Sequence, residues 1–304
     1  MANVIEIQHL YKSYKDVKAV KDLSFKVKEG ELFAFLGVNG AGKSTTISVI
    51  CGLLNKDSGK VYINGEDIDK NPDGIKRTLG VVYQTSALDK SLTVRDNLEH
   101  RASLYGIVGK ECIDRINTLK KLLEFEDFID RPIGKLSGGQ KRKVDIARAL
   151  IHEPKILILD EPTTGLDPQT RSTLWKVIKD LRQEKKMTVL LTTHYMEEAA
   201  DADYVVIIDD GSLVAEGTPV QLKNQYTGDF ITVYGVGKEK LSLLTDSAEE
   251  VVGGYRFEVK NTAYATALIQ KYPELFFDYE VTKGKMDSVF LSVTGKKLSG
   301  GEQK

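Results

Sequence analysis

Three sets of side chains in this sequence are suited to chemistry. A glycine-rich run at residues 37–44 includes Lys43, two carboxylates stand together at Asp160 and Glu161, and His194 follows an apolar stretch. Glycines allow successive backbone amides to curl around phosphate oxygens, and a lysine beside them can reach the outer phosphates. A carboxylate pair can hold a divalent cation and deprotonate an attacking water. These residue types together indicate binding and hydrolysis of a nucleoside triphosphate.

The glycine-rich run has the spacing of a phosphate-binding P-loop. It reads Gly37, Val38, Asn39, Gly40, Ala41, Gly42, Lys43 and Ser44, followed by Thr45. An apolar run at 31–36 predicts a buried strand before it, and residues 45–54 predict a helix after it. The positive end of that helix would face the phosphates. Lys43 would then reach the outer phosphates of ATP, and the Ser44 hydroxyl would help to bind Mg²⁺.

The acidic pair ends a second apolar run. Residues 156–159 predict a buried strand, with Asp160 and Glu161 at its C-terminal end. Buried carboxylates without a cation or strong donors nearby are very costly. We therefore expect Asp160 to hold Mg²⁺ directly or through water, and Glu161 to orient and deprotonate the attacking water. The alternative is an exposed pair that merely makes a turn soluble.

The elements that would position these residues alternate between strands and helices. Further strands are predicted at 61–63, 80–83, 188–191 and 204–208, and helices at 144–151, 169–183 and 196–202. This alternation implies an α/β fold whose largely parallel sheet is covered on both faces. The first 30 residues instead read as strands joined by tight turns, and residues from about 93 to 143 read as a helical insert.

The pattern changes after Pro219. Residues 230–236, 255–259 and 276–281 predict half-buried strands, with a helix at 264–271. These elements would form a small α+β C-terminal domain at 229–296, of a size near the lower limit for a separate core. We expect its boundary to lie between 219 and 228, and residues 297–304 to form a flexible tail.

The bulk composition excludes several classes of protein. Because 43 basic and 44 acidic residues leave a net charge of −1, no global positive field exists and no nucleic-acid partner is expected. The two cysteines, Cys51 and Cys112, fit a reducing compartment better than a disulfide framework. No apolar run approaches the ~20 residues that span a bilayer. We therefore expect a soluble protein whose membrane role comes through a partner.

A further motif indicates a family. Residues 136–140 read Leu-Ser-Gly-Gly-Gln, and with the P-loop and the acidic pair they resemble the signature of ATP-binding-cassette (ABC) ATPases. Ser137, Gly138, Gly139 and Gln140 offer a hydroxyl and bare amides ahead of a helix, which is a second anion cradle. The resemblance implies a head-to-tail dimer with a second copy, in which each signature covers the ATP on the other copy's P-loop. The first four of these residues, Leu-Ser-Gly-Gly, recur at 298–301 without a following helix, so we give that copy no role.

Four more residues fall where the resemblance expects functional side chains. Gln84, after the 80–83 strand, would bind Mg²⁺ and sense the γ-phosphate, unless it is only a polar strand cap. Asp167 would help to organise the partner copy's site, and it is also suited to cap a helix. His194 would contact the γ-phosphate rather than serve as a structural hydrogen bonder. Tyr14 would stack on adenine, with Tyr11 as a competitor and a packed surface aromatic as the alternative.

The resemblance implies an ABC cassette over residues 4–228. The cassette comprises an N-terminal antiparallel β subdomain, the P-loop core sheet and the helical insert. Residues 86–98 and 286–295 resemble the drug and antibiotic exporter branch, whose partner is a separate integral membrane permease of the ABC-2 type. Lipid, polysaccharide and sodium exporters carry similar ATPases. The chain would then be cytoplasmic, held on the inner face of the cell membrane by the permease.

Two features would couple such an ATPase to its permease. The surface near Gln84 and the helix at 98–105 would pass the motion on, unless 98–105 is simply insert core. The alternative function is a soluble ABC ATPase that acts on ribosomes or DNA. A single cassette disfavours the translation-factor members, and an insert without heptad arms or zinc-type Cys pairs disfavours the DNA-repair members. We expect a homodimer, and a C-terminal domain that stabilises it or tunes its cycle.

Overall fold

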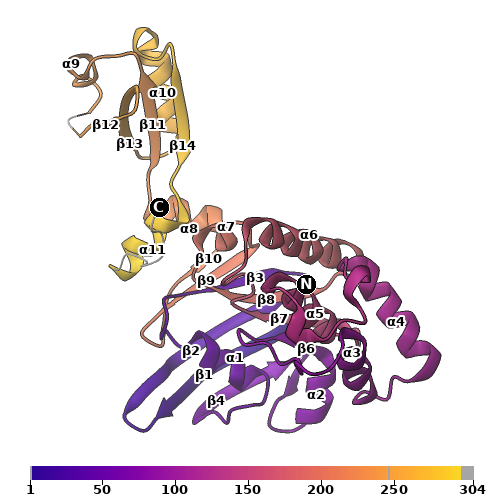
Figure 1. Cartoon of the computed structure of the whole chain (residues 1–304). Helices are drawn as coiled ribbons and strands as arrows, with labels where there is room; N and C mark the ends of the chain where they lie inside the picture. The colour runs from indigo at the N-terminus through magenta and orange to yellow at the C-terminus, as the bar shows by residue number, and fades with distance from the viewer. Residues whose placement is uncertain (1, 246, 296–304) are drawn as a thin grey trace. The chain divides into compact units, whose positions relative to one another are not determined.

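The chain forms two compact units that divide between Leu213 and Val214. The structure is a computed structural model that describes residues 2–245 and 247–295 (Figure 1). The division lies before the expected range of 219–228, because α8 (Pro219–Tyr226) packs on α11 (Met286–Thr294) within the second unit. The expected tail at 297–304, with its Leu-Ser-Gly-Gly repeat, lies outside the described residues.

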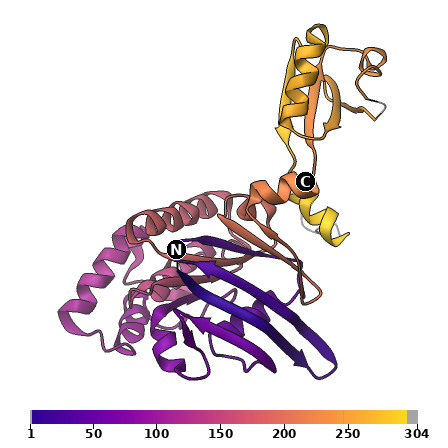
Figure 2. The ribbon, with the colours of Figure 1, turned by 180° about the vertical axis from the view of Figure 1, so that it is seen from behind.

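The first unit begins with an antiparallel sheet. It comprises β1 (Asn3–Tyr14), β2 (Val17–Lys28), β4 (Ser58–Ile63) and β5 (Glu66–Asp67), in the order β2-β1-β4-β5. Ile5 and Ile7 are buried and alternate with more exposed neighbours, as a strand with one covered face requires. Figure 2 shows β1 and β2 as long adjacent strands. This sheet confirms the expected N-terminal antiparallel subdomain.

The second sheet is largely parallel, and the division between the two units falls within its last strand, β10. Its six strands are β3 (Leu32–Leu36), β6 (Leu79–Val82), β7 (Ile156–Asp160), β8 (Thr188–Thr193), β9 (Tyr204–Asp209) and β10 (Ser212–Gly217), in the order β10-β9-β3-β8-β7-β6. The pairs β6–β7, β7–β8, β3–β8 and β3–β9 are all parallel. Every residue of β3, β7 and β8 is buried, as is typical of parallel strands covered on both faces. The expected α/β fold is confirmed.

Several helices pack against this sheet. Helix α1 (Lys43–Ile50) contributes to one core cluster with residues of both sheets, including Phe25 of β2 and Phe35 of β3. Helices α6 (Pro168–Lys185) and α7 (Met196–Ala200) pack on β8, and α5 (Gly138–Leu150) packs on β6. The short α2 (Pro72–Thr78) leads into β6.

The helical insert joins two neighbouring strands, β6 and β7. It contains α3 (Val94–Ser103), α4 (Gly109–Leu122), the short 3₁₀ helices η1 (Glu126–Phe128) and η2 (Ile133–Lys135), and the start of α5. Helix α5 begins at Gly138 and not at 144 as the apolar pattern predicted, because Ser137 and Gln140 form a capping box at its first turn. Helix α1 ends at Ile50, earlier than the predicted 54.

Parallel strands bring their carboxyl ends to one edge of the sheet. Leu36 pairs with Thr193, Asp160 pairs with Thr192, and Val82 pairs with Leu159. The loops that follow β3, β6, β7 and β8 therefore all start at this edge. These four loops carry the P-loop, Gln84, Glu161 and His194.

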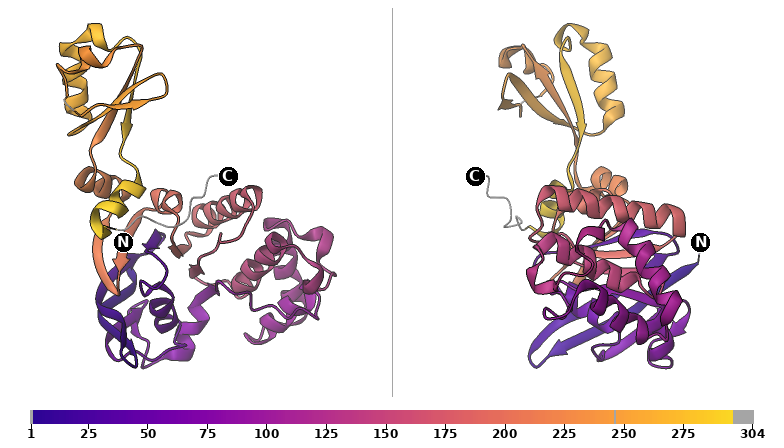
Figure 3. Two further views of the ribbon diagram at one scale, coloured as in Figure 1. Left: turned by 60° about the vertical axis from the view of Figure 1, so that its left-hand side comes forward. Right: turned by 45° about the vertical axis from the view of Figure 1, so that its right-hand side comes forward.

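The second unit contains a four-stranded antiparallel sheet. Its strands are β11 (Asp229–Tyr234), β12 (Glu249–Val251), β13 (Gly254–Val259) and β14 (Tyr279–Lys283), in the order β12-β13-β11-β14. Helix α10 (Thr262–Lys271) lies along this sheet (Figure 3), and its Ala265 and Leu268 belong to the same buried apolar cluster as residues of the strands. The short helices α9 (Lys238–Leu241) and η3 (Pro273–Leu275) complete the unit. The predicted strand at 276–281 starts only at Tyr279, because Phe276 is the C-cap of η3 and is buried in the apolar cluster of this unit.

No helix among residues 2–245 and 247–295 is both long enough and apolar enough to cross a bilayer.

Candidate active site

The P-loop connects the end of β3 to the start of α1. Gly40 and Gly42 have φ angles of +84° and +103°, a region that favours glycine. A Cβ at Gly42 would lie 2.5 Å from the Ala19 carbonyl oxygen, and one at Gly37 would lie 2.7 Å from that of Ile208. The loop is therefore held tightly against its neighbours, and no side chain caps the first turn of α1. The amides of this first helical turn are available to bind an anion.

Lys43 lies within this loop and is almost completely buried. Its Nζ donates hydrogen bonds to the carbonyl oxygens of Gly37 at 2.7 Å and Val38 at 3.1 Å. The same atom lies 3.5 Å from Glu161 Oε1. Burial lowers the pKa of Lys43, and the charges of Glu161 and Asp160 oppose that shift. The lysine is thus placed between the loop and the acidic pair.

The remaining P-loop residues differ in exposure. Asn39, Gly40 and Ser44 are exposed, Val38 and Thr45 are half-buried, and Ala41 is buried. A Cβ at Gly40 would meet nothing within 4 Å, so the outer side of the loop is open. This arrangement leaves room for a ligand against the loop without any movement of the core.

Asp160 is the last residue of β7 and is 6% exposed. Its Oδ1 accepts hydrogen bonds from Thr192 Oγ1 at 2.5 Å and from Ser44 Oγ at 3.3 Å. The alternative of an exposed pair at a turn is therefore wrong. A hydroxyl and a carboxylate oxygen side by side are hard ligands of the kind that Mg²⁺ prefers, and one or two such protein ligands are its usual number.

Glu161 is the point at which the candidate residues meet. Its Oε2 accepts a hydrogen bond from Gln84 Nε2 at 3.2 Å and lies 3.4 Å from His194 Nδ1. Its backbone has a φ of +46°, and its amide is held by the Oγ1 of Thr192 at 3.0 Å. A positive φ outside glycine is strained and is often found at functional sites. The carboxylate thus stands among Lys43, Gln84 and His194.

The approach of His194 Nδ1 to the Glu161 carboxylate is not a hydrogen bond. Among the described residues, His194 Nδ1 has no hydrogen-bond partner although it is shielded from solvent. The ring also lies 4.2 Å from that of Tyr195. A buried ring nitrogen without a partner is a group that a ligand oxygen would satisfy.

The two aromatic residues considered for adenine stacking are both available. Tyr14 is 48% exposed and Tyr11 is 41% exposed. Tyr14 lies at the end of β1, in the hairpin that leads to Ala19, and Ala19 approaches the P-loop at Gly42. Its ring is also 5.9 Å from Lys12 Nζ. The expectation for Tyr14 stays a prediction.

The signature residues form the start of α5. Ser137 Oγ accepts from the Gln140 amide at 3.2 Å, and Gln140 Oε1 accepts from the Ser137 amide at 3.0 Å. A Cβ at Gly139 would lie 2.6 Å from Thr170 Oγ1, whereas one at Gly138 would meet nothing within 4 Å. Within the described part of the chain, no hydrogen bond or ion pair joins residues 137–140 to Lys43, Ser44 or Asp160.

Asp167 adjoins the signature through Thr170. Its Oδ1 accepts from the Thr170 amide at 2.9 Å, which caps α6, and its Oδ2 accepts from Thr170 Oγ1 at 2.6 Å. The capping role expected for Asp167 is confirmed. Because Gly139 packs on the same threonine, the signature and Asp167 lie together on one surface.

Arg142 is a buried residue of this region that the motif analysis did not single out. It is 8% exposed and donates hydrogen bonds to the carbonyl oxygens of Tyr83 and Pro162. Its position could have been noticed from the helix pattern, because a charged residue at 142 precedes Ile146 and Leu150 on the apolar face of α5.

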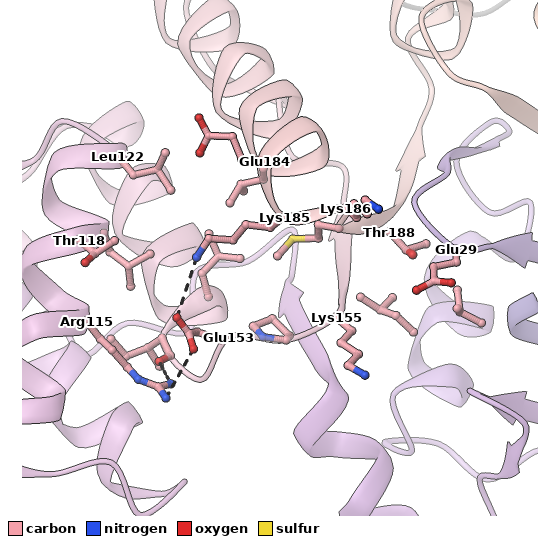
Figure 4. A pocket seen from close by; sticks show the side chains of 18 of the residues that line it. Glu29, Arg115, Thr118, Leu122, Glu153, Lys155, Glu184, Lys185, Lys186 and Thr188 are labelled. Carbon is pink, nitrogen blue, oxygen red and sulfur yellow. Dashed lines mark hydrogen bonds and ion pairs between the residues drawn. The ribbon is translucent and has the colours of Figure 1, made fainter. Parts of the chain in front are cut away.

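A large hollow of the first unit lies elsewhere. It measures about 1240 Å³ and is lined from α4, α6 and the starts of β7 and β8 (Figure 4). Glu153 lines this hollow and forms ion pairs with Arg115 at 3.6 Å and with Lys185 at 4.0 Å. Because it is at the amino ends of the strands, this hollow contains none of the candidate site residues.

Comparison with known proteins gives the family. Residues 20–164 match the ABC transporter family model. The chain is 36% identical over 301 residues to Nod factor export ATP-binding protein I of Burkholderia orbicola (strain AU 1054), which covers 97% of this chain and 98% of that protein. It is 35% identical over 315 residues to Linearmycin resistance ATP-binding protein LnrL of Bacillus subtilis (strain 168), covering 97% and 99%.

Solved structures agree with these relatives. The dimeric ATP-binding cassette MJ0796 bound to ADP and Pi has a TM-score of 0.66 and 30% identity, covering 71% of this chain and 98% of that one. CbiO1 of Clostridium perfringens, part of the ABC transporter complex cbiONQ, has a TM-score of 0.67 and 31% identity, covering 73% and 91%.

The chain belongs to the ABC transporter family. Within that family it is an ATP-binding subunit and an ATPase, as the motifs predicted. The likeness to the two export and resistance proteins spans nearly the whole chain, so it includes the second unit as well as the cassette.

Proposed function

We propose that this chain hydrolyses ATP to drive an exporter whose membrane-spanning permease is a separate polypeptide. The observation that carries the proposal is the arrangement around Glu161, where Lys43, Gln84 and His194 all approach one carboxylate. A protein that only binds nucleotide has no need of a buried base with these neighbours. The names of the two relatives, one for export and one for resistance, support the transport role.

The proposed chemistry assigns one task to each residue. The P-loop amides and Lys43 bind the phosphates, with Lys43 exchanging its two carbonyl acceptors for phosphate oxygens. Ser44 and Asp160 would hold Mg²⁺, with Gln84 beside them, and the ion neutralises phosphate charge. Glu161 orients the attacking water and accepts its proton. His194 donates toward the γ-phosphate.

The second half of the site comes from another copy of the chain. Residues 137–140 make no contact with the P-loop in the described residues of one chain, and the open space at Gly138 could admit a second ligand. We propose a head-to-tail homodimer in which each signature, with Asp167 beside it, closes over the other copy's ATP. The dimeric MJ0796 cassette supports this arrangement. ATP closes the dimer, and hydrolysis reopens it.

The insert presents a surface suited to the permease. Leu98 is fully buried and belongs to the insert core, whereas Leu104 is 71% exposed and Val108 is 64% exposed. The segment 98–105 therefore combines a buried leucine with an exposed one, and Val108 follows it, which is consistent with both roles considered for this segment. We propose that the exposed apolar pair and the segment after Gln84 contact the permease, which holds the chain at the inner face of the membrane.

We propose a drug, antibiotic or lipid-like cargo, which is consistent with the names of the relatives. The test is co-expression with a permease encoded beside it, followed by flotation of membranes and purification in detergent. The chain should float with membranes only when the permease is present, and cargo export should stop in Lys43→Ala. Recovery with ribosomes or nucleoid, whatever the permease, would instead favour the soluble ABC ATPase.

The proposed role of the C-terminal domain is best tested with an internal deletion rather than a truncation. Removing everything after Gly228 would also remove α11 and expose the face of α8 that packs on it. Gly284 approaches Thr227 so closely that a Cβ there would lie 1.9 Å from Thr227 Oγ1. Joining Gly228 to Gly284 therefore deletes the sheet and retains both helices. We expect weaker dimerisation or an altered ATPase rate, and no change in either would exclude the role.

A further inference from the structure

Arg142 makes an unusual set of contacts for a buried cation. Its guanidinium donates to the carbonyl oxygens of Tyr83 at 2.7 Å, Pro162 at 2.8 Å, Glu161 at 3.2 Å and Asp160 at 3.4 Å. Within the described residues it forms no ion pair with a carboxylate. A buried charge is costly, so these four carbonyl groups, together with the nearby charges of Asp145 and Asp160, must compensate for it. Only arginine offers enough donors in one plane to do so.

The four carbonyl groups belong to the ends of two neighbouring strands. The β6–β7 ladder ends at the pair Val82 and Leu159. Beyond it the strands separate into the loops that carry Gln84 and Glu161, and their carbonyl groups would otherwise lack ladder partners. Arg142 bridges the two loops at that point. The bridged carbonyl groups include that of Tyr83, which precedes Gln84, and that of Glu161 itself, and the side chains of Gln84 and Glu161 are 3.2 Å apart.

A second residue of α5 holds the same loop one turn further on. Asp145 Oδ1 accepts a hydrogen bond from Ser86 Oγ at 3.0 Å, and the Ala87 amide also bonds this carboxyl group. Asp145 is 7% exposed. Residues 83–87 are thus fastened to α5 at both ends, by Arg142 and by Asp145. The same helix begins at the signature, with Ser137 as its cap.

We propose that Arg142 is a positioning residue for ATP hydrolysis. It sets the spacing of Gln84 and Glu161, and together with Asp145 it makes the Gln84 loop move with the signature helix. A displacement of α5 by the partner copy's nucleotide is then passed to the chain's own site without any contact between the two ligands. The inference rests on the ATP hydrolysis described above, and it adds a group that touches neither nucleotide nor water.

The test compares Arg142→Lys with two other variants of the full-length chain. Lysine keeps the charge but cannot reach four carbonyl groups, so we expect kcat to fall about 10- to 100-fold, the scale of a 1 Å misplacement. The KM for ATP and the Kd of a fluorescent ATP analogue should stay within about twofold, because the P-loop is untouched. Arg142→Met, which also loses the charge, should be slower still.

Ser86→Ala tests the same coupling in a second way, in case the Arg142 variants do not fold. Ser86 is exposed, and its removal loosens the Asp145 attachment along with a long, 3.4 Å hydrogen bond from the Leu88 amide. We therefore expect kcat to fall about two- to fivefold, the scale of one lost hydrogen bond. Lys143→Met is the matched control. Its Nζ contacts Glu124 at 3.4 Å on the other side of α5, and it should hydrolyse ATP at the wild-type rate.

A double-mutant cycle with Gln84→Ala completes the experiment. If Arg142 acts through Gln84, the double variant should be about as slow as the slower single variant, because coupled residues are not additive. Wild-type kcat in both Arg142→Lys and Ser86→Ala, or losses that multiply in the double variant, would overturn the inference. Absence of hydrolysis by the wild-type chain would instead contradict the ATPase assignment, so the two failures can be told apart.

Discussion

The Nε2 atom of Gln84 lies 3.2 Å from Oε2 of Glu161, and the two side chains extend from the ends of neighbouring parallel strands. Thr164 Oγ1 donates to the same oxygen at 3.3 Å, while Lys43 Nζ faces the other carboxylate oxygen at 3.5 Å. The carboxylate is therefore held in one orientation from several sides. Such pre-orientation is what a base acting on a single water requires.

Glu161→Gln should separate binding from hydrolysis. The amide keeps the size of the side chain and its contact with Thr164, but it cannot accept a proton. We expect kcat to fall by roughly 10²–10⁴, the usual contribution of a general base. ATP binding should persist, so size-exclusion chromatography with ATP should show a lasting dimer. Glu184→Gln, an exposed position on α6, is the control, and equal activity in the two variants would contradict the assignment.

Lys43→Ala should act on binding itself. The buried ammonium is the cation nearest to the P-loop carbonyl groups, and it also faces Glu161. Loss of a charge-assisted hydrogen bond to phosphate should raise the Kd for ATP about 10- to 100-fold. Titration with a fluorescent ATP analogue measures this directly. The exposed Lys70→Ala should bind as the wild type does, and retention of full affinity in Lys43→Ala would be incompatible with the proposed site.

The two signature glycines should respond differently to alanine. A Cβ at Gly139 would lie 2.6 Å from Thr170 Oγ1, so Gly139→Ala should lower the free energy of unfolding by about 1–3 kcal/mol. Gly138 begins a helix and has open space, so Gly138→Ala should leave stability unchanged or raise it by up to about 1 kcal/mol. Chemical unfolding of both variants measures this contrast.

The ATPase activity, unlike the stability, should be sensitive to alanine at Gly138. If the open side of Gly138 faces the partner copy's ATP, a methyl group there should reduce ATPase activity and ATP-dependent dimerisation about tenfold or more. A stable Gly138→Ala with wild-type ATPase activity would show that the signature does not close over a nucleotide. Because the monomer itself tolerates the change, the result reports on the dimer alone.

Local spacing made the centre of the site predictable. The P-loop lies in consecutive residues between a strand and a helix, and Asp160 and Glu161 end a strand of the same parallel sheet. Parallel strands bring their carboxyl ends to one edge of a sheet, so the P-loop and the acidic pair were expected in one site, and the structure adds the 3.5 Å approach of Lys43 to Glu161. The family resemblance added Gln84 and His194, and the structure places both against the same carboxylate.

Long-range contacts account for what was missed. Arg142 reaches the carbonyl group of Tyr83 across 59 residues of sequence, and only the docking of α5 on β6 determines that contact. The strand predicted at 276–281 started late because Pro273 begins a 3₁₀ turn that buries Phe276. Helix α11 was not predicted as a helix, although Met286, Val289 and Phe290 are buried at helical spacing. The partner that covers that face, α8, lies far away in the sequence.

His152 should make the stability of the first unit depend on pH. Its Nε2 lies 3.1 Å from the Leu79 carbonyl oxygen, and its ring stacks on Tyr105 with centroids 4.0 Å apart. Burial lowers the pKa of His152 to about 4, and the charges of Arg101 and Arg115 act in the same direction. Among the described residues, Nδ1 is buried without a hydrogen-bond partner, so a proton there would be poorly solvated.

The sign of this effect follows from the two pKa values. The folded-state pKa of His152, about 4, is below the ordinary value of 6.5, so the unfolded chain takes up the proton first as the pH falls. Stability should therefore decrease from pH 6.5 to about 4 and should not be affected by this group above pH 6.5. At pH 5 the loss should be about 1–2 kcal/mol. His152→Gln cannot titrate, so in urea unfolding its stability relative to the wild type should improve between pH 7.5 and pH 5. A constant difference between the two proteins over that range would show that His152 is not held neutral in the folded chain.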